Sequence, residues 1–394
     1  MNSKSKQLKS NAITFGLVIV FYAAMEAWLM SGKMSSLMEG LLVPVCYYMI
    51  LAVSLNLVVG ISGELSLGHA GFMCVGAFSS AIFARTAGAN MPEMAELIIA
   101  VLIGAAVAAV FGFLIGIPVL RLRGDYLAIV TLAFGEIIKN VINAVYLGVD
   151  AGGVHVSLKD VKSLGMDDTG EVIIKGAQGI GNLPRNATFT IGIILLLITL
   201  FIIMNLINSR QGRAIMSSRD NRIAAESVGL TVSKYKLTAF VISAALAGVA
   251  GVLYSHNLAN LQATSKNFGY NQSILILVFV VLGGIGNIRG SLIAAVILTV
   301  LPEKLRFFSD YRMLIYAVVL IVMMIMTSAP KVVEWRKVIS EKYFKKPKRA
   351  AAGGSPAAVK GTVNVSAAQE KAEGSKSGAS VSTDTASDNG NKEV

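Results

Sequence analysis

Residues 187–256 read ATFTIGIILLLITLFIIMNLINSRQGRAIMSSRDNRIAAESVGLTVSKYKLTAFVISAALAGVAGVLYSH, in which two apolar runs flank a polar stretch at 208–237. Each run reaches the roughly 20 residues that a helix needs to cross a bilayer. The polar stretch carries six Lys or Arg against two acids, an Ala-Ala pair at Ala224 and Ala225, and Gly229. This composition is typical of a folded cytoplasmic element between two membrane helices, where a soluble partner can make contact.

The rest of the chain also alternates apolar runs with polar stretches. Of its 394 residues, 54% are hydrophobic and 15% are charged, whereas soluble domains have about 25% charged residues. A soluble fold would need a larger apolar core than one domain supplies. We therefore predict an all-α polytopic membrane protein with about eight to ten transmembrane segments, some broken or re-entrant. The ten apolar segments lie at 12–30, 38–58, 66–85, 96–118, 126–147, 187–207, 237–256, 272–286, 291–303 and 312–328.

Positive charge is distributed as in a membrane protein. The net charge of +12 comes from residues next to apolar segments, and no aromatic-studded basic groove accompanies it, which argues against nucleic-acid binding. If the N-terminus is cytoplasmic, every basic loop falls on the cytoplasmic side, as the positive-inside rule requires. Both termini are then cytoplasmic and loop 148–186 is external. The predicted regions are a tail at 1–11, a transmembrane domain at 12–328, a basic segment at 329–349 and a disordered tail at 350–394.

The sequence carries few signs of catalytic or metal chemistry. Cys46 and Cys74 fall inside apolar segments, where thiols pack as small apolar groups. His69, His155 and His256 lack the spacing of metal ligands, and no G-x-x-x-x-G-K-[ST] motif is present. We predict no metal and no nucleotide bound by this chain. The sequence has no nucleophile, metal site or acid pair that would support a membrane-embedded enzyme.

Two apolar segments are interrupted by glycine clusters, at 60–69 (GISGELSLGH) and at 283–290 (GGIGNIRG). Irregular backbone at membrane depth is tolerated only where protein buries it or where it lines a watery cavity, and paired broken helices mark transport sites. The alternative is a pair of tight turns between short helices at the cytoplasmic face. The sequence leaves both interpretations open.

Glu136 lies in the middle of segment 126–147, with Lys139 three residues later. Ionisable residues inside a bilayer are costly and suggest a function. A salt bridge between these two side chains would instead neutralise both charges. Transport and structural pairing remain equally open for Glu136.

The polar stretch 208–237 predicts a short amphipathic helix of about two turns. Ser218 or Asp220 provides an N-cap and Gly229 a C-terminal stop. A small or apolar face is predicted for Ile223, Ala224, Ser227 and Val228. A helix resting on lipid would prefer bulky side chains to Ala, so the face favours docking into a protein groove.

Four stretches of this sequence resemble the LivM-type membrane subunits of bacterial ABC importers for branched-chain amino acids. They are LNLVVGISGELSLGHAGFMCVGA (55–77), RLRGDYLAIVTLAFGEIIKNVIN (121–143), GRAIMSSRDNRIAAESVGLTVSKYKLTAFVISAALAGVAGVLY (212–254) and GGIGNIRGSLIAAVIL (283–298). Together they cover most of residues 40–305, and RLRGDYLAIVTLAFGEI is the most specific of them.

The resemblance implies a non-catalytic subunit in a bacterial inner membrane that moves its substrate by alternating access. Its partners would be a LivH-type sister permease, two cytoplasmic ABC ATPase subunits that hold ATP and Mg, and a periplasmic or lipid-anchored amino-acid-binding protein. Segment 212–236 would be the element that contacts the ATPase, through Arg219, Asp220, Ile223, Ala224, Ala225, Val228 and Gly229. We expect the translocation path to include Gly63, Glu64, Ser66, His69, Thr131, Glu136, Gly284 and Gly286.

One departure from the family concerns the external loop. A compact T-G-G-P-x-G-I motif is expected there, but its two halves match residues 150–153 and 176–180, on either side of an insertion at roughly 154–175. This departure leaves the identity of the substrate open. The extension of the family to urea, amides and other amino acids does so as well. The alternative function is a stand-alone ion-coupled transporter of amino acids with Glu136 as its coupling carboxylate.

Overall fold

The computed structural model describes residues 3–88, 91–120, 125–150, 153–166, 170–305 and 311–328. All of them belong to one compact unit, residues 1–337. The predicted basic segment at 329–349 and the tail at 350–394 lie outside the described residues, as do Arg121 and Arg123.

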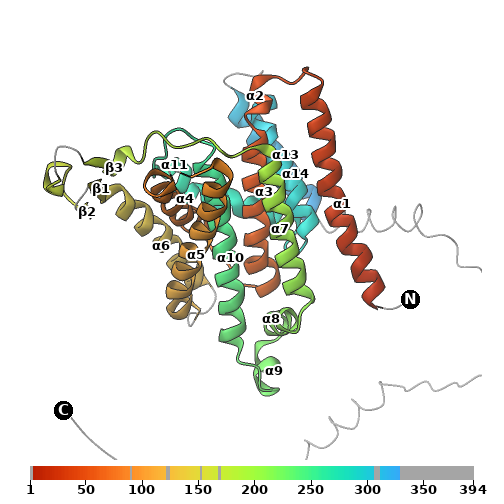
Figure 1. The fold of residues 1–394 in the computed structure, drawn as a ribbon. Helices are drawn as coiled ribbons and strands as arrows, with labels where there is room; N and C mark the ends of the chain where they lie inside the picture. The colour runs from red at the N-terminus through yellow and green to blue at the C-terminus, as the bar shows by residue number, and fades with distance from the viewer. Residues whose placement is uncertain are drawn as a thin grey trace, which may run out of the picture. The chain divides into compact units, whose positions relative to one another are not determined.

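Every predicted apolar segment contains a helix (Figure 1). These helices are α1 (Ser3–Met30), α3 (Leu42–Asn56, continued by the π-helical turn Leu57–Ser62), α4 (His69–Arg85), α5 (Glu93–Val119), α6 (Asp125–Ala144), α7 (Phe189–Asn208), α10 (Val232–Ser255), α12 (Tyr270–Gly283), α13 (Ile288–Lys304) and α14 (Arg312–Ser328). Short helices α2 (Ser36–Glu39) and α11 (Ser265–Phe268) precede α3 and α12. Among the described residues, six helical stretches are long and apolar enough to cross a membrane, so the all-α polytopic fold is confirmed.

The core is built where α4, α5 and α10 pack through small residues. Helix α5 buries a small residue at every fourth position: Ala100, Gly104, Ala108, Gly112 and Gly116. A Cβ atom added to Gly248 of α10 would lie 2.6 Å from the Cβ of Ala108, and one added to Gly76 of α4 would lie 2.4 Å from the Cα of Gly248. Small residues allow helix backbones to approach this closely in membranes, where packing rather than water drives association.

Helix α3 is buried on all sides. Its membrane-spanning window is 83% buried within the chain, compared with 22% for α5. Helices α7, α10, α12 and α13 surround it. A helix that is apolar all round suits such an interior position, and α3 is therefore the central element of the described fold.

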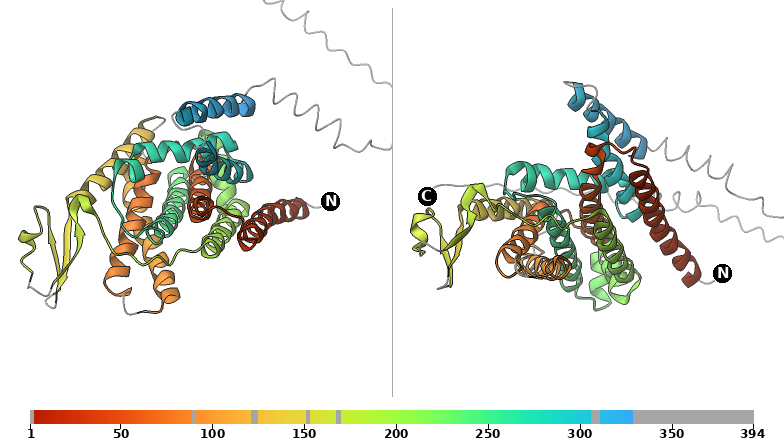
Figure 2. Two further views of the ribbon diagram at one scale, coloured as in Figure 1. Left: turned by 90° about the horizontal axis from the view of Figure 1, so that it is seen from above. Right: turned by 45° about the horizontal axis from the view of Figure 1, so that its top comes forward.

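The chain between α6 and α7 forms a small antiparallel sheet of β1 (Tyr146–Asp150), β2 (Gly153–Ser157) and β3 (Glu171–Lys175), in the order β2-β1-β3. Short 3-10 turns at Lys162–Leu164 and Gly176–Gln178 follow β2 and β3. Both views of Figure 2 place the strands beyond the end of α6, on the side away from α1. Because Asp150 pairs with Gly153 and Tyr146 pairs with Lys175, the two halves of the split motif lie at opposite ends of β1. They do not form one compact loop.

Polar stretch 208–237 lies at one end of the helices. Its helices α8 (Arg210–Asp220) and α9 (Arg222–Ser227) occupy the lower part of Figure 1, as does the start of α1, whereas α2 and α11 occupy the upper part. This arrangement agrees with the alternation of segments used for the topology. Which end faces the cytoplasm stays a prediction.

The close helix contacts give a direct test of the fold. Changing Gly248 to Ala adds a methyl group 2.6 Å from both the Gly104 carbonyl oxygen and the Ala108 side chain, so backbone must move. We expect a destabilisation of about 1–3 kcal/mol, seen as a lower midpoint of thermal unfolding in detergent. Gly16→Ala is the matched control, because a Cβ there meets nothing within 4 Å. Equal midpoints for the two variants would show that α10 does not pack this tightly.

Candidate coupling and transport site

Polar stretch 208–237 folds as two helices and not as one. Asn221 has an extended backbone, with φ −154° and ψ 103°, and separates α8 from α9. Its side-chain oxygen accepts a hydrogen bond from the N–H of Ala224 at 3.0 Å, so Asn221 is the N-cap of α9. The prediction of Ser218 or Asp220 as the cap was wrong, because both residues lie in the last turn of α8.

Gly229 ends α9 as predicted. Its φ of +84° is left-handed, a conformation that glycine adopts without a Cβ clash. The N–H of Leu230 donates to the carbonyl of Ala225 at 3.1 Å, and the N–H of Gly229 donates to that of Glu226 at 3.0 Å. These two bonds form a Schellman motif. Helix α9 is therefore capped at both ends and presents a defined surface despite its short length.

The exposed surface of α9 consists of small and apolar side chains. Ile223 is 81% exposed and Val228 is 75% exposed, and Ala224 and Ser227 are also exposed. We call these four residues the α9 face. Ala225 is only 4% exposed and packs inward, so it does not belong to the α9 face, and its predicted role in the partner contact stays a prediction. The helical period turns successive residues by about 100°, which separates the two neighbouring alanines.

Arg219 makes its contacts with the end of α3 and with Asp220, although its side chain is 37% exposed. Its Nη1 donates to the carbonyl oxygen of Gly60 at 2.7 Å, and its Nε and Nη2 donate to Oδ1 of the exposed Asp220 at 3.0 and 2.8 Å. A Cβ atom on Gly63 would lie 2.5 Å from Cγ of Arg219, so the arginine stem lies against that glycine. Arg219 therefore joins α8 to the broken end of α3.

The two glycine clusters, more than 200 residues apart in sequence, meet in space. A Cβ atom on Gly60 would lie 2.3 Å from the backbone nitrogen of Gly286. The N–H of Gly286 donates to Oδ1 of the buried Asn56 at 2.8 Å, and Nδ2 of Asn56 donates to Oγ of Ser291 at 2.9 Å. We call this contact, completed by Arg219, the glycine joint.

The second glycine cluster fits the interpretation as a tight turn, and the first fits the interpretation as a broken helix. Residues 284–287 make a tight turn between α12 and α13, with left-handed φ at Gly284 and Gly286. The first cluster is a break in a buried helix, which ends in π-helical backbone before Gly63. The turn packs on the break, so protein groups replace the hydrogen bonds that the broken helix loses.

Several predicted path residues lie in the segment between the end of the π-helical turn and α4, or contact that segment. Glu64 forms an ion pair with Lys236 at the start of α10. The Leu67 N–H donates to Oγ1 of the buried Thr131 at 3.0 Å, which holds α6 against this segment. The buried hydroxyl of Ser66 has no partner among the described residues. His69 is buried too, with its Nε2 at 2.8 Å from Oγ of Ser54, so it faces the core and not an open channel.

Glu136 does not join this group. Its carboxylate forms an ion pair with Lys139, and its Oε1 accepts a hydrogen bond from the N–H of Tyr270 at 2.8 Å. Lys139 also donates to Oγ of Ser265 at 2.9 Å. These contacts hold α6 to α11 and to the first residue of α12, and they favour the structural pairing over a free carboxylate.

A second buried polar group escaped the sequence analysis. His256 Nε2 lies 3.0 Å from Oε1 of Glu96, and Nδ2 of Asn186 donates to the other oxygen of that carboxylate at 2.6 Å. Glu96 sits in the first turn of α5, where an acid is favourable. The group joins the start of α5 to the end of α10 and the chain before α7. Among the described residues, no three His, Cys, Asp or Glu gather closely enough for a metal ion.

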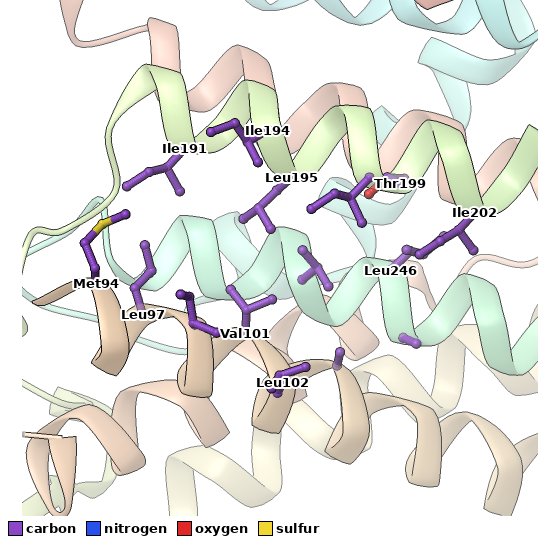
Figure 3. A pocket seen from close by; sticks show the side chains of 15 residues that line it. Met94, Leu97, Val101, Leu102, Ile191, Ile194, Leu195, Thr199, Ile202 and Leu246 are labelled. Carbon is purple, nitrogen blue, oxygen red and sulfur yellow. The ribbon is translucent and has the colours of Figure 1, made fainter. Parts of the chain in front are cut away.

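A large groove lies between α5, α7 and α10, with a volume of about 560 Å³. In Figure 3, Ile191, Ile194 and Leu195 of α7 face Leu97 and Val101 of α5 across it. Thr199 is its only hydroxyl-bearing residue, and no lining residue is charged. Burying a charged group without a partner is costly, so this groove does not suit an amino-acid zwitterion.

A family profile described as branched-chain amino acid transport system / permease component matches residues 37–327. The chain belongs to this family. The matched region of the permease includes the glycine joint, the α9 face and the three-stranded sheet.

Three curated relatives show the range of the family. The high-affinity branched-chain amino acid transport system permease protein LivM of Salmonella typhimurium is 37% identical over 71% of this permease and 66% of the relative. The permease thus spans just under two thirds of that relative's length. The fructose import permease protein FruG of Bifidobacterium longum is 24% identical, over 72% and 78% of the two chains. LivH of Salmonella typhimurium is 25% identical, over 64% and 80%. No solved structure matches the permease.

The pairing of Glu136 with Lys139 predicts a specific pattern of stability. Glu136→Gln leaves the ammonium of Lys139, whose side chain is 8% exposed, without its counter-charge. Removing one partner of a fully buried pair costs about 3–5 kcal/mol, and the loss here should be smaller because Glu136 is a quarter exposed. Thermal unfolding measures it.

The double variant Glu136→Gln with Lys139→Met should recover most of the lost stability, because no unpaired charge remains. A double variant as unstable as the sum of the two single variants would contradict the pairing. Loss of transport in Glu136→Gln with unchanged stability would restore a transport role.

Proposed function

We propose that this chain is the non-catalytic permease subunit of an ATP-driven importer of branched-chain amino acids in a bacterial inner membrane. The α9 face is the observation that carries the proposal. It is exposed, small and apolar, and it belongs to a helix that is capped at both ends. The α9 face suits a groove in a protein partner better than a lipid surface, which favours bulkier side chains.

The partner at the α9 face is a cytoplasmic ABC ATPase. Ile223 and Val228 supply the exposed apolar area of the contact, and Ala224 allows close approach. The chain has no P-loop of its own, so ATP and Mg are held by the partner subunits. Two ATPases, a LivH-type sister permease and an amino-acid-binding protein complete the assembly.

Movement of the ATPases reaches the membrane through the glycine joint. A push on α9 is passed to α8, and Arg219 connects α8 to the Gly60 carbonyl. Gly60 touches the turn at Gly286, which is the tip of the α12–α13 hairpin. The hairpin and α3 thus shift together, which supports alternating access between the two sides of the membrane.

An ion-coupled transporter is less well supported, because it needs a carboxylate that can exchange its ion. Glu136 is already held by the Lys139 ammonium and the Tyr270 N–H, so its carboxylate is not free to exchange an ion. That alternative also gives the α9 face no role.

The proposed partner contact makes a prediction for two adjacent alanines. Ala224→Arg places a charge on the exposed α9 face and should abolish ATP-dependent uptake of radiolabelled leucine, while the chain still inserts and unfolds at the wild-type temperature. Ala225→Arg buries the same charge inside the chain and should lower the unfolding temperature. The measurements are uptake into proteoliposomes that contain the whole assembly, and thermal unfolding of each purified variant.

The two variants separate a docking role from a structural one. Normal uptake by a folded Ala224→Arg variant would exclude the α9 face as the ATPase contact. Leucine uptake by this chain in the absence of the ATPase subunits would contradict the proposed function as a whole.

A further inference from the structure

A second large cavity lies at the end of the α12–α13 hairpin that is remote from the glycine joint. Its volume is about 560 Å³. Its walls come from the first half of α3, the end of α10, α11, the first turns of α12, the last turns of α13, and α14. We call it the outer cavity. The groove of Figure 3 has the same volume, but only the outer cavity combines aromatic, amide and charged side chains.

One wall of the outer cavity is aromatic and tightly packed. The rings of Tyr47 and Tyr254 meet edge to face, with centroids 5.4 Å apart, and those of Tyr48 and Phe279 do so at 5.5 Å. Tyr47 and Tyr48 are also in contact with one another, at 4.6 Å. Such edge-to-face pairs are favourable, so the wall is a preformed surface for an apolar group.

Other residues that line the cavity carry polar and charged groups. Lys266 of α11 contributes an exposed ammonium group, and Glu303 of α13 contributes a carboxylate. The amides of Asn271 and Gln272 lie between them in sequence, on the first turn of α12, where Gln272 is buried. An amino-acid zwitterion needs a donor for its carboxylate, an acceptor for its ammonium group and an apolar surface for its side chain. The outer cavity offers all three.

The position of the outer cavity connects it to the glycine joint. Helix α12 begins at the outer cavity and ends at Gly283, and α13 returns from the turn at 284–287 to the cavity at Glu303. A ligand that touches α12 and α13 at one end therefore touches the same hairpin that the joint moves at the other. A binding site coupled to ATP hydrolysis requires such a connection.

We infer that the outer cavity binds an amino acid with an aliphatic side chain, with Lys266 facing its carboxylate and Glu303 its ammonium group. The aromatic wall then receives the side chain. The choice of an amino acid rests on the proposed function, and the site itself rests on the residues that line the cavity.

Photo-leucine, an L-leucine analogue that carries a diazirine, tests the site in the whole assembly in nanodiscs without nucleotide. After irradiation, we expect mass spectrometry to find labelled residues in α3, α12 or α13 next to the outer cavity, and excess L-leucine to suppress the labelling. Lys266→Met and Glu303→Gln should each weaken labelling about tenfold or more, because each loses a charge-assisted hydrogen bond. Lys304→Met is the matched control, since Lys304 is an exposed neighbour that does not line this cavity.

Wild-type labelling at other positions, or labelling that Lys266→Met and Glu303→Gln leave unchanged, would overturn the site. Uptake by the same wild-type preparation in proteoliposomes is measured separately. An assembly that labels in the outer cavity but does not use ATP for uptake supports the site and refutes the proposed function. An assembly that imports leucine without labelling there refutes the site alone.

Discussion

The interior of a bilayer offers no water to a peptide group, so a membrane helix can break only where other protein groups replace its lost hydrogen bonds. The helix made of α3 and its π-helical turn ends before Gly63, and contacts from distant parts of the chain hold its last turns. Arg219 of α8 donates to the Gly60 carbonyl, and Asn56 accepts from the N–H of Gly286 at the tip of the α12–α13 hairpin. These two hydrogen bonds join the end of α3 to α8 and to this hairpin.

This constraint gives the molecule two functional ends. At one end, the capped α9 presents its small apolar face, and in the proposed mechanism α8 passes a displacement to Gly60. At the other, the first residues of α12 and the last of α13 line the outer cavity. The packing of α4, α5 and α10 through small residues supplies a rigid frame beside them. In the proposed mechanism, the closely packed α4, α5 and α10 stay in place while a displacement at α9 reaches the hairpin.

The positions of the helices could be predicted because apolar runs alternate with polar stretches, although segments 272–286 and 291–303 are shorter than the roughly 20 residues that cross a bilayer. The end of α9 at Gly229 could be predicted from the conformational freedom of glycine. The N-cap was predicted wrongly, because Ser218, Asp220 and Asn221 are all good caps and only packing distinguishes them. The burial of Ala225 depends on the packing of α9 against α8 and α10, and Arg219 bonds to Gly60, about 160 residues earlier in the chain. The group around Glu96 and His256 joins residues 160 positions apart, and no local pattern signals such a contact.

The central claim is that Arg219 transmits movement from α8 to the broken helix. The most direct measurement is the number of leucine molecules imported per ATP hydrolysed, in proteoliposomes that contain the whole assembly with Arg219→Met. The methionine keeps a stem to pack beside Gly63 but cannot donate to the Gly60 carbonyl. ATP hydrolysis should continue while import per ATP falls severalfold. A folded Arg219→Met assembly that imports as much leucine per ATP as the wild type would contradict the account.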